Sequence, residues 1–168
     1  MSGILYKTSF PTIIGKIYCV YTEKGEIAFL GNDAEDLKGF IDLLIEKDGL
    51  SVKEKPSKYI KNRLDDYLSG KSKKIDLKTV LLTGSDFEKK IWSSTADIGH
   101  GQLSTYKDIA SLSGNPGAYR AAGTALSKNP IFLIIPCHRV IKSDGSIGGF
   151  SSGIDLKKKL LRLEGIKI

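Results

Sequence analysis

The stretch IIPCHRVIKS, residues 134–143, places one of the two cysteines of the chain directly beside one of its two histidines. Cys137 and His138 follow an apolar run, and Arg139 comes next. A thiolate is a strong nucleophile, but a free thiol with a pKa of about 8.5 is only slightly ionised near neutral pH. Nucleophilic chemistry at Cys137 therefore needs a nearby base. Because successive extended residues point to opposite faces, adjacency does not predict contact between Cys137 and His138, and the histidine could act through a bridging water.

The apolar run before the thiol is IFLII, residues 131–135, with a proline on either side. It is long enough for one buried strand, which would place Cys137 at the edge of the core. A thiol in apolar surroundings is normally inert. The sequence therefore leaves open whether Cys137 is a nucleophile or a structural residue.

A carboxylate near the end of the chain is a candidate partner for the histidine. The last helix is expected over about residues 155–164, and Gly165 is typical of a helix C-terminus. Glu164 lies in its final turn, where a carboxylate opposes the helix dipole. Such a group is either an ordinary surface residue or one held in place for function, for example to polarise a histidine. The expected buried stripe of this helix consists of Leu156, Leu160 and Leu163.

Two short helices are predicted on either side of the turn GNPG at residues 114–117, which is the pattern of a helix-turn-helix. Thr105 can cap the first helix, and the second covers about residues 118–128. The second helix consists mostly of small residues with one long cation, Arg120. Small residues allow close approach of either another helix or a nucleic-acid groove, and the net charge of +7 favours the groove. The expected apolar face of the first helix consists of Ile109 and Leu112.

Composition limits the class of protein. The chain has 168 residues, of which 40 % are hydrophobic and 27 % charged, as in ordinary globular proteins. Without an apolar run of roughly 20 residues or a signal-peptide pattern, we expect a cytoplasmic protein with no membrane partner. Cys19 lies in an alternating β-like run and is expected to be a small core residue. No metal site is expected, since the cysteines and histidines lack the close spacing of zinc ligands.

The first half of the chain predicts an α+β structural domain, residues 1–80, followed by a second domain, residues 81–168. KIYCVYT and EIAFLG flank a glycine-containing turn and predict a hairpin. Two amphipathic helices are expected over residues 33–47 and 57–70, followed by a lysine-rich connector. The second domain opens with a capping box, SDFE, which predicts a helix to about residue 97. The inward positions of the two amphipathic helices are Leu37, Phe40, Ile41, Leu44 and Ile45, and then Ile60, Leu64, Tyr67 and Leu68.

The block IPCHRV, preceded by SKNP and followed by SDGSIGGFSSG, closely resembles the O6-alkylguanine-DNA alkyltransferases, or methylated-DNA–protein-cysteine methyltransferases. The match runs from Phe87 to Gly165 and includes TYKDIA, GNPGAYRAAGTAL and LLRLEG. The resemblance implies a ribonuclease-H-like N-terminal α+β domain and a mainly helical C-terminal domain with a helix-turn-helix. It also implies a monomer without a cofactor.

The implied reaction is the in-line transfer of the alkyl group of O6-alkylguanine, and of O4-alkylthymine, from duplex DNA to Cys137. The resemblance makes Cys137 the nucleophile, and Glu164, His138 and a water the relay that forms its thiolate. Tyr106 would protonate the leaving guanine, and Asn129 would act as a hinge behind the recognition helix. Since the thioether product is stable, each molecule would act once.

The same resemblance implies binding in the minor groove with a flipped-out nucleotide. Arg120 would fill the gap that this nucleotide leaves in the base stack. Two departures stand out: Gly99 and His100 replace the usual proline, and Phe150 replaces a common tyrosine. Further DNA contacts would come from Tyr106, Lys107, Asn115 and Ser143. The alkylguanine pocket would include Val140, Phe150 and Ser151.

Two alternatives remain open at this point. One is a binding module without transfer, either a base-flipping sensor of alkylated DNA or a helix-turn-helix regulator. The relatives that work as sensors replace the nucleophilic cysteine, so Cys137 argues against this class. The other is a thiol hydrolase that uses Cys137, His138 and Glu164, for which the sequence shows no oxyanion-hole signature.

Overall fold

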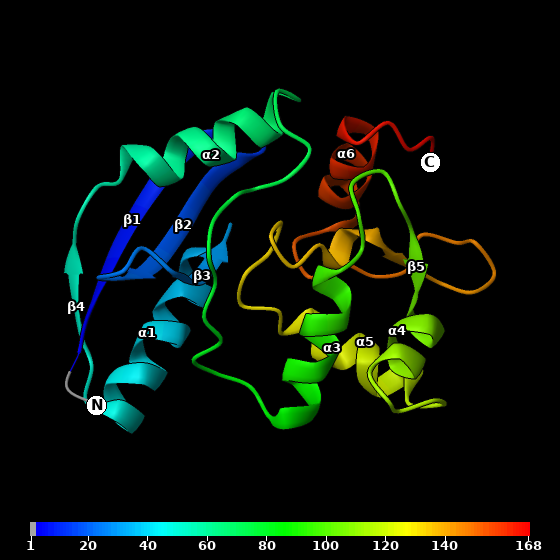
Figure 1. Cartoon of the computed structure of the whole chain (residues 1–168), viewed down its shortest axis with the longest axis horizontal. Helices are drawn as coiled ribbons and strands as arrows, with labels where there is room; N and C mark the ends of the chain where they lie inside the picture. The colour runs from blue at the N-terminus through cyan, green and yellow to red at the C-terminus, as the bar shows by residue number, and fades with distance from the viewer. Residues whose placement is uncertain (1–2) are drawn as a thin grey trace. The chain divides into compact units, whose positions relative to one another are not determined.

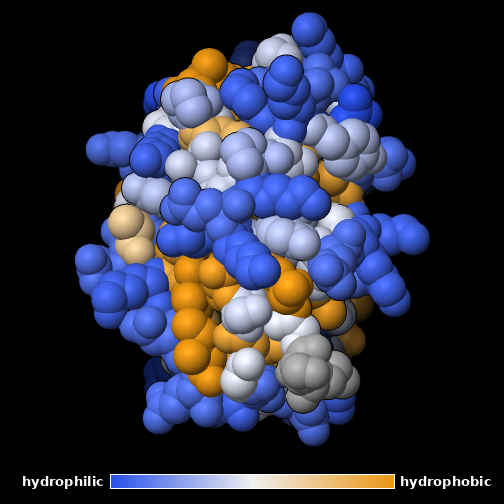
Figure 2. Space-filling model, turned by 90° about the vertical axis from the view of Figure 1, so that its left-hand side faces the viewer, coloured by the Kyte–Doolittle hydropathy of each residue, from blue (hydrophilic) through white to orange (hydrophobic). Residues whose placement is uncertain are grey.

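The computed structural model describes residues 3–168 and divides into two compact units, one ending at Leu82 and the other running from Thr83 to Ile168 (Figure 1). Strands are concentrated in the first unit and helices in the second. None of the helices in the described part of the chain is long and apolar enough to cross a membrane. Figure 2 shows one face of the molecule, where hydrophilic residues cover most of the surface and the largest patch of apolar residues lies in the lower part of the view.

The first unit is built on a four-stranded sheet with the order β3-β2-β1-β4. The predicted hairpin is confirmed as β2 and β3, which pair antiparallel. β1 continues the antiparallel arrangement, whereas β4 pairs parallel with β1. Sequence reasoning missed both of these strands; β4 has no apolar alternation of its own and owes its place to pairing across the sheet. The strands are β1 (Ile4–Thr12), β2 (Gly15–Thr22), β3 (Ile27–Gly31) and β4 (Ser51–Glu54).

Two helices complete this unit, α1 (Ala34–Asp48) and α2 (Lys58–Leu68). All four apolar residues expected to face inward from α2 are buried. On α1 the expectation is wrong for Ile45, which is 48 % exposed. Phe40 and Leu44 are buried, and Leu37 and Ile41 are partly buried against the core. The core cluster consists of Leu5, Val20, Ala28, Phe29, Phe40 and Leu44.

The second unit begins with α3 (Asp86–Ala96), whose predicted capping box is present in both directions between Ser85 and Glu88. The helices predicted around GNPG are confirmed as α4 (Tyr106–Leu112) and α5 (Tyr119–Ser127). Helices α3, α4 and α5 contact one another, and the Trp92 indole of α3 donates a hydrogen bond to the Ala125 carbonyl of α5 at 2.8 Å. The remaining elements are β5 (Ser104–Thr105), the 3₁₀ helix η1 (Cys137–Arg139), β6 (Val140–Ile141), which is parallel to β5, and α6 (Ile154–Leu163).

The strand expected over residues 131–135 does not form; this segment is a series of turns. The Ile135 N–H donates to the Ile131 carbonyl, and Leu133 has a φ of 68°, which an extended strand does not allow. The run is buried as predicted, but it satisfies its backbone groups locally. Because residues 131–135 have no neighbouring strand to pair with, this buried segment folds into a compact loop that ends at Cys137.

Two predicted buried positions are also wrong. Leu112 at the end of α4 is 71 % exposed, and Leu163 at the end of α6 is 42 % exposed. The buried face of α6 instead includes Leu161 and the fully buried Lys157. The buried face of α6 is thus shifted by about one residue from the predicted face. As a result, Lys157 lies in the interior.

Candidate functional site

The thiol of Cys137 lies at the start of η1 and is buried, with only 7 % of the residue exposed. Burial raises the pKa of this thiol, while the hydrogen bond from Asn129 and the charge of Lys157 act in the opposite direction. No hydrogen bond joins the Cys137 thiol to the His138 ring, in keeping with the prediction that adjacency alone does not bring the two side chains into contact. The thiol therefore depends on groups brought to it from elsewhere in the unit.

Asn129, just beyond the end of α5, organises the loop that carries the thiol. Its amide Nδ2 donates to the Ile135 carbonyl at 2.8 Å and to Cys137 Sγ at 3.2 Å. Its Oδ1 accepts from the Ile131 N–H at 2.9 Å. One side chain thus fixes both ends of the turns at residues 131–135 and positions the sulfur at the same time.

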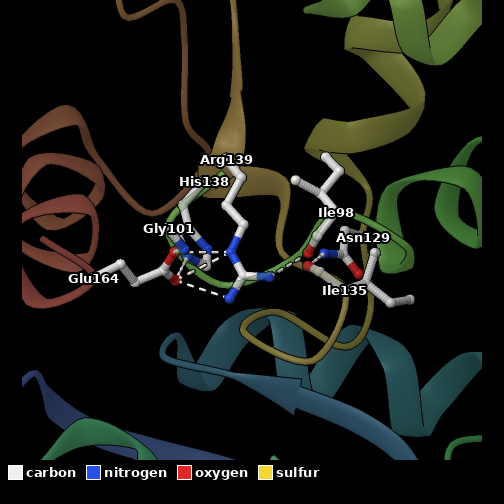
Figure 3. A network of polar contacts seen from close by, with 7 residues as sticks. All are labelled: Ile98, Gly101, Asn129, Ile135, His138, Arg139 and Glu164. Carbon is white, nitrogen blue, oxygen red and sulfur yellow. Dashed lines mark hydrogen bonds and ion pairs between the residues drawn. The ribbon is translucent and has the colours of Figure 1, made fainter. Parts of the chain in front are cut away.

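His138 and Glu164, which are 26 positions apart in sequence, meet inside the unit (Figure 3). His138 Nε2 lies 2.6 Å from Glu164 Oε1, and the histidine is completely buried. Burial lowers the pKa of His138 despite the neighbouring carboxylate, so the ring is neutral at pH 7. Because a carboxylate only accepts hydrogen bonds, Nε2 must carry the proton of the neutral ring. Nδ1 is then the basic nitrogen, and it has no hydrogen-bond partner among residues 3–168.

Arg139 completes this network, although sequence reasoning gave it no role. Its Nε donates to both carboxylate oxygens of Glu164, at 3.1 and 2.9 Å, and Nη2 adds a bond of 2.9 Å. Nη1 donates to the Ile98 carbonyl, and the Gly101 N–H donates to Glu164 Oε2 at 3.0 Å. Figure 3 shows Gly101, His138 and the Arg139 guanidinium gathered around the Glu164 carboxylate, with the Ile98 carbonyl on the far side of the guanidinium. A guanidinium in an apolar segment was the available signal, since buried arginines require a partner such as a carboxylate.

A cavity of about 590 Å³ opens beside the thiol. Five of the predicted site residues line this cavity: Cys137, Tyr106 on α4, Arg120 on α5, and Phe150 and Ser151 in the loop before α6. Val140 does not line it: its side chain is fully buried, and its carbonyl faces Lys157. The lining residues are Tyr106, Tyr119, Arg120, Gly123, Leu126, Ser127, Cys137, Lys142, Gly149, Phe150 and Ser151.

Tyr106, the first residue of α4, reaches across to the loop on the other side of this cavity. Its hydroxyl donates to the Gly149 carbonyl at 3.3 Å, and burial raises its pKa. A Cβ at Gly148 would lie 2.9 Å from the Tyr106 hydroxyl, and this glycine has a φ of 72°. The loop backbone therefore needs glycine at position 148 in order to approach the tyrosine so closely.

The residues predicted to contact DNA outside the cavity lie on the surface of the second unit. Lys107 on α4 and Ser143 in the turn after β6 are exposed. Asn115 is half-buried in the turn between α4 and α5, where its amide donates to the Ser113 carbonyl at 3.0 Å. Arg120 on α5 is exposed and lies over the ring of Tyr119. In the described part of the chain, no three His, Cys, Asp or Glu side chains come together as a metal ion would require.

The two cysteines should differ sharply in reactivity. Cys19 is fully buried in β2, and burial raises its pKa to about 12, whereas Cys137 borders a cavity. We expect the disulfide reagent DTNB to modify one thiol in the native protein and both after unfolding in guanidinium chloride, as measured by absorbance and intact mass. Peptide mapping should place the native modification on Cys137; rapid modification of Cys19 in the folded protein would contradict this prediction.

Comparison with known proteins places this geometry in a family. Residues 86–166 match the family described as 6-O-methylguanine DNA methyltransferase, DNA binding domain. A Methanosarcina barkeri protein named methylated-DNA–protein-cysteine methyltransferase is 42 % identical over 149 residues, which cover 83 % of this chain and 90 % of that protein.

Two solved structures are similar over nearly the whole chain. The crystal structure of Mycobacterium tuberculosis OGT in complex with DNA has a TM-score of 0.78 at 26 % identity, covering 95 % of this chain and 93 % of that one. The O6-methylguanine-DNA methyltransferase of Pyrococcus kodakaraensis has a TM-score of 0.69 at 28 % identity, with 96 % and 99 % coverage. The chain therefore belongs to the family of methylated-DNA–protein-cysteine methyltransferases.

Proposed function

We propose that this protein repairs alkylated DNA by direct reversal, moving the alkyl group of O6-alkylguanine, and of O4-alkylthymine, from duplex DNA to Cys137. The observation that carries this proposal is the thiol at the wall of the 590 Å³ cavity, backed by a neutral histidine with a free basic nitrogen. A cavity of this size is within the range that holds small organic ligands. The names of the relatives support the choice of substrate.

Formation of the thiolate is the first step. Glu164 accepts the Nε2 proton of His138 and thereby leaves Nδ1 as the base. Nδ1 takes the thiol proton of Cys137 through a water, because the two side chains share no direct hydrogen bond. Arg139 holds Glu164 in its charged form by bonding to both of its oxygens.

Transfer of the alkyl group follows. The sulfur of Cys137 forms a bond to the alkyl carbon while the bond from that carbon to O6 breaks, and the electron pair passes to the guanine. Tyr106, which lines the same cavity, donates its proton to guanine N3. The tyrosine regains a proton from solvent as His138 releases the proton that it took from the thiol, so that in sum the thiol proton passes to the guanine. The product is a neutral thioether, which is stable to hydrolysis, so each molecule acts once.

Recognition of DNA is assigned to the second unit. Helices α4 and α5 act as a helix-turn-helix that enters the minor groove, where the small residues of α5 permit close approach. Arg120, exposed near the start of α5, replaces the extruded nucleotide in the base stack. The proposed backbone contacts come from Lys107, Asn115 and Ser143. The proposed pocket contacts come from Phe150 and Ser151, which line the cavity, whereas Val140 does not line it and is left out of the proposal.

The first unit is proposed to be a ribonuclease-H-like domain over residues 1–80, with the transferase domain over residues 81–168. The sheet order β3-β2-β1-β4, with β4 alone parallel to β1, supports this assignment. No candidate chemical group of the proposed reaction lies in this unit, so its contribution is structural.

The test is to mix the protein with duplex DNA that carries one O6-methylguanine and to weigh the intact protein. The expected result is the addition of one methyl group, located on Cys137 by peptide mapping, with no more than one equivalent transferred per molecule. Unmodified protein that nevertheless binds the duplex tightly would overturn transfer and identify a sensor of alkylated DNA. Transfer that continues beyond one equivalent would overturn the single-use mechanism.

A further inference from the structure

Lys157 on α6 is a completely buried lysine beside the proposed reaction centre. Its Nζ donates to the Val140 carbonyl at 2.6 Å and to the Gly149 carbonyl at 3.0 Å. The Val140 carbonyl belongs to β6, directly after η1, and the Gly149 carbonyl belongs to the loop that lines the cavity. The lysine therefore ties β6, the strand that follows η1, to the loop that lines the cavity through a single ammonium group.

This ammonium has no carboxylate partner among residues 3–168, in contrast to the buried Arg139, which pairs with Glu164. Burying an unpaired cation is costly, and natural chains seldom retain one without a function. Desolvation lowers the pKa of Lys157 to about 8, and the Cys137 charge acts in the opposite direction. The interaction is mutual, since the charge of Lys157 also favours the ionised form of Cys137. The thiolate is thus a negative charge that the site itself can supply to this lysine.

The Gly149 carbonyl links Lys157 to Tyr106, the proposed proton donor to the leaving guanine. It accepts hydrogen bonds from Lys157 Nζ and from the Tyr106 hydroxyl. Lys157 Nζ also lies 5.9 Å from the centre of the Tyr106 ring. One ammonium is therefore in position to act on both the nucleophile and the tyrosine that faces the leaving group.

We propose that Lys157 is a positioning residue of the alkyl-transfer site: its ammonium clamps the Val140 and Gly149 carbonyls and supplies the positive charge that stabilises the Cys137 thiolate. The proposal rests on the proposed function in taking Cys137 as the nucleophile. In this proposal, two groups share the formation of the Cys137 thiolate. His138 removes the proton, and Lys157 stabilises the anion that remains. Neutralisation of the sulfur by alkylation then removes the counter-charge of the lysine.

Other groups also face the thiol and must be separated from Lys157 in any test of pH dependence. Asn129 donates to the sulfur, and His138 follows it in η1 with Glu164 and Arg139 behind. Tyr106 of α4 interacts electrostatically with Cys137. Arg120 and Lys142 border the same cavity.

The test measures the rate at which iodoacetamide alkylates Cys137 between pH 5 and pH 10, followed by intact mass without DNA. Lys157→Met removes both the charge and the clamp, whereas Lys157→Gln keeps an amide donor for the carbonyls but removes the charge. Lys158→Gln, at the next position on the same helix and outside the cavity lining, is the matched control. We expect both Lys157 variants to react about tenfold or more slowly at pH 7, with the midpoint of the rate profile moved to higher pH, as loss of a nearby charge dictates.

Each outcome bears on the proposal. A Lys157→Gln profile that coincides with the wild-type and Lys158→Gln profiles would leave only the clamp and overturn the electrostatic role. A rate that falls equally at every pH would also overturn it, because a purely structural change does not move the midpoint. If Lys157→Met fails to fold, Lys157→Gln carries the test. Failure of the wild type to accept a methyl group from DNA would overturn the proposed function, and the iodoacetamide profile would remain interpretable.

Discussion

Replacement of Cys137 by alanine should abolish methyl transfer from duplex DNA that carries O6-methylguanine, leaving the mass of the protein unchanged after incubation. Binding to the same duplex should change by less than about threefold, or roughly 0.7 kcal/mol. The reason is that the thiol is the proposed acceptor, whereas the proposed DNA contacts lie on α4, α5 and the turn after β6. Transfer is measured by intact mass and binding by fluorescence anisotropy of a labelled duplex.

The matched control is Cys19→Ala, which removes the other thiol of the chain from the core of the first unit. This variant should lose some stability but retain one equivalent of transfer. Transfer that survives Cys137→Ala, or that disappears in well-folded Cys19→Ala, would show that the acceptor has been assigned to the wrong residue.

Glu164→Gln should lower the free energy of unfolding of the second unit by about 3 kcal/mol, because Arg139 would then be a buried charge without its counter-ion. Thiol reactivity should fall as well, since His138 loses the carboxylate that selects its tautomer. Urea unfolding followed by fluorescence of Trp92, the single tryptophan and fully buried, reports on this unit. Asp155→Asn is the control, since it removes an exposed carboxylate from the first turn of the same helix at a cost of about 0.3–1 kcal/mol.

The same measurement has a defined pH dependence. Because burial lowers the pKa of His138, the unfolded chain binds more protons than the folded protein just below the ordinary value of 6.5. The contribution of His138 to stability is therefore lost as the pH falls from 6.5 through the lower folded pKa. In Glu164→Gln the stabilising effect of the carboxylate on the protonated ring is absent, so this loss should extend to lower pH. Equal losses in Glu164→Gln and Asp155→Asn would contradict the proposed network.

Local chemistry made several elements predictable. The capping box at Ser85 and Glu88 starts α3, because its hydrogen bonds lie within four residues. The hairpin β2–β3 follows from alternating apolar residues around a glycine-containing turn. The GNPG turn separates α4 from α5 as expected.

The arrangement of the site was harder to predict from the sequence. Residues 131–135 were expected to be a strand because they are apolar, but Asn129 ties them into turns through its side-chain hydrogen bonds. Apolar composition predicts burial and leaves the backbone path undecided, because that path depends on which partners satisfy its polar groups.

By itself, the sequence determined which reactive groups exist and where the local elements begin and end: a thiol beside an imidazole, a carboxylate in the last helical turn, two helices around a glycine turn. The partnership of Glu164 with His138 was implied only by the family resemblance, and the tertiary structure shows the contact itself. Only the tertiary structure decided that Arg139 joins this pair and that Lys157 lies inside. The physical reason is distance along the chain. A cap or a turn is decided by neighbours a few residues apart, whereas the charge state of a buried group depends on residues that only packing brings together.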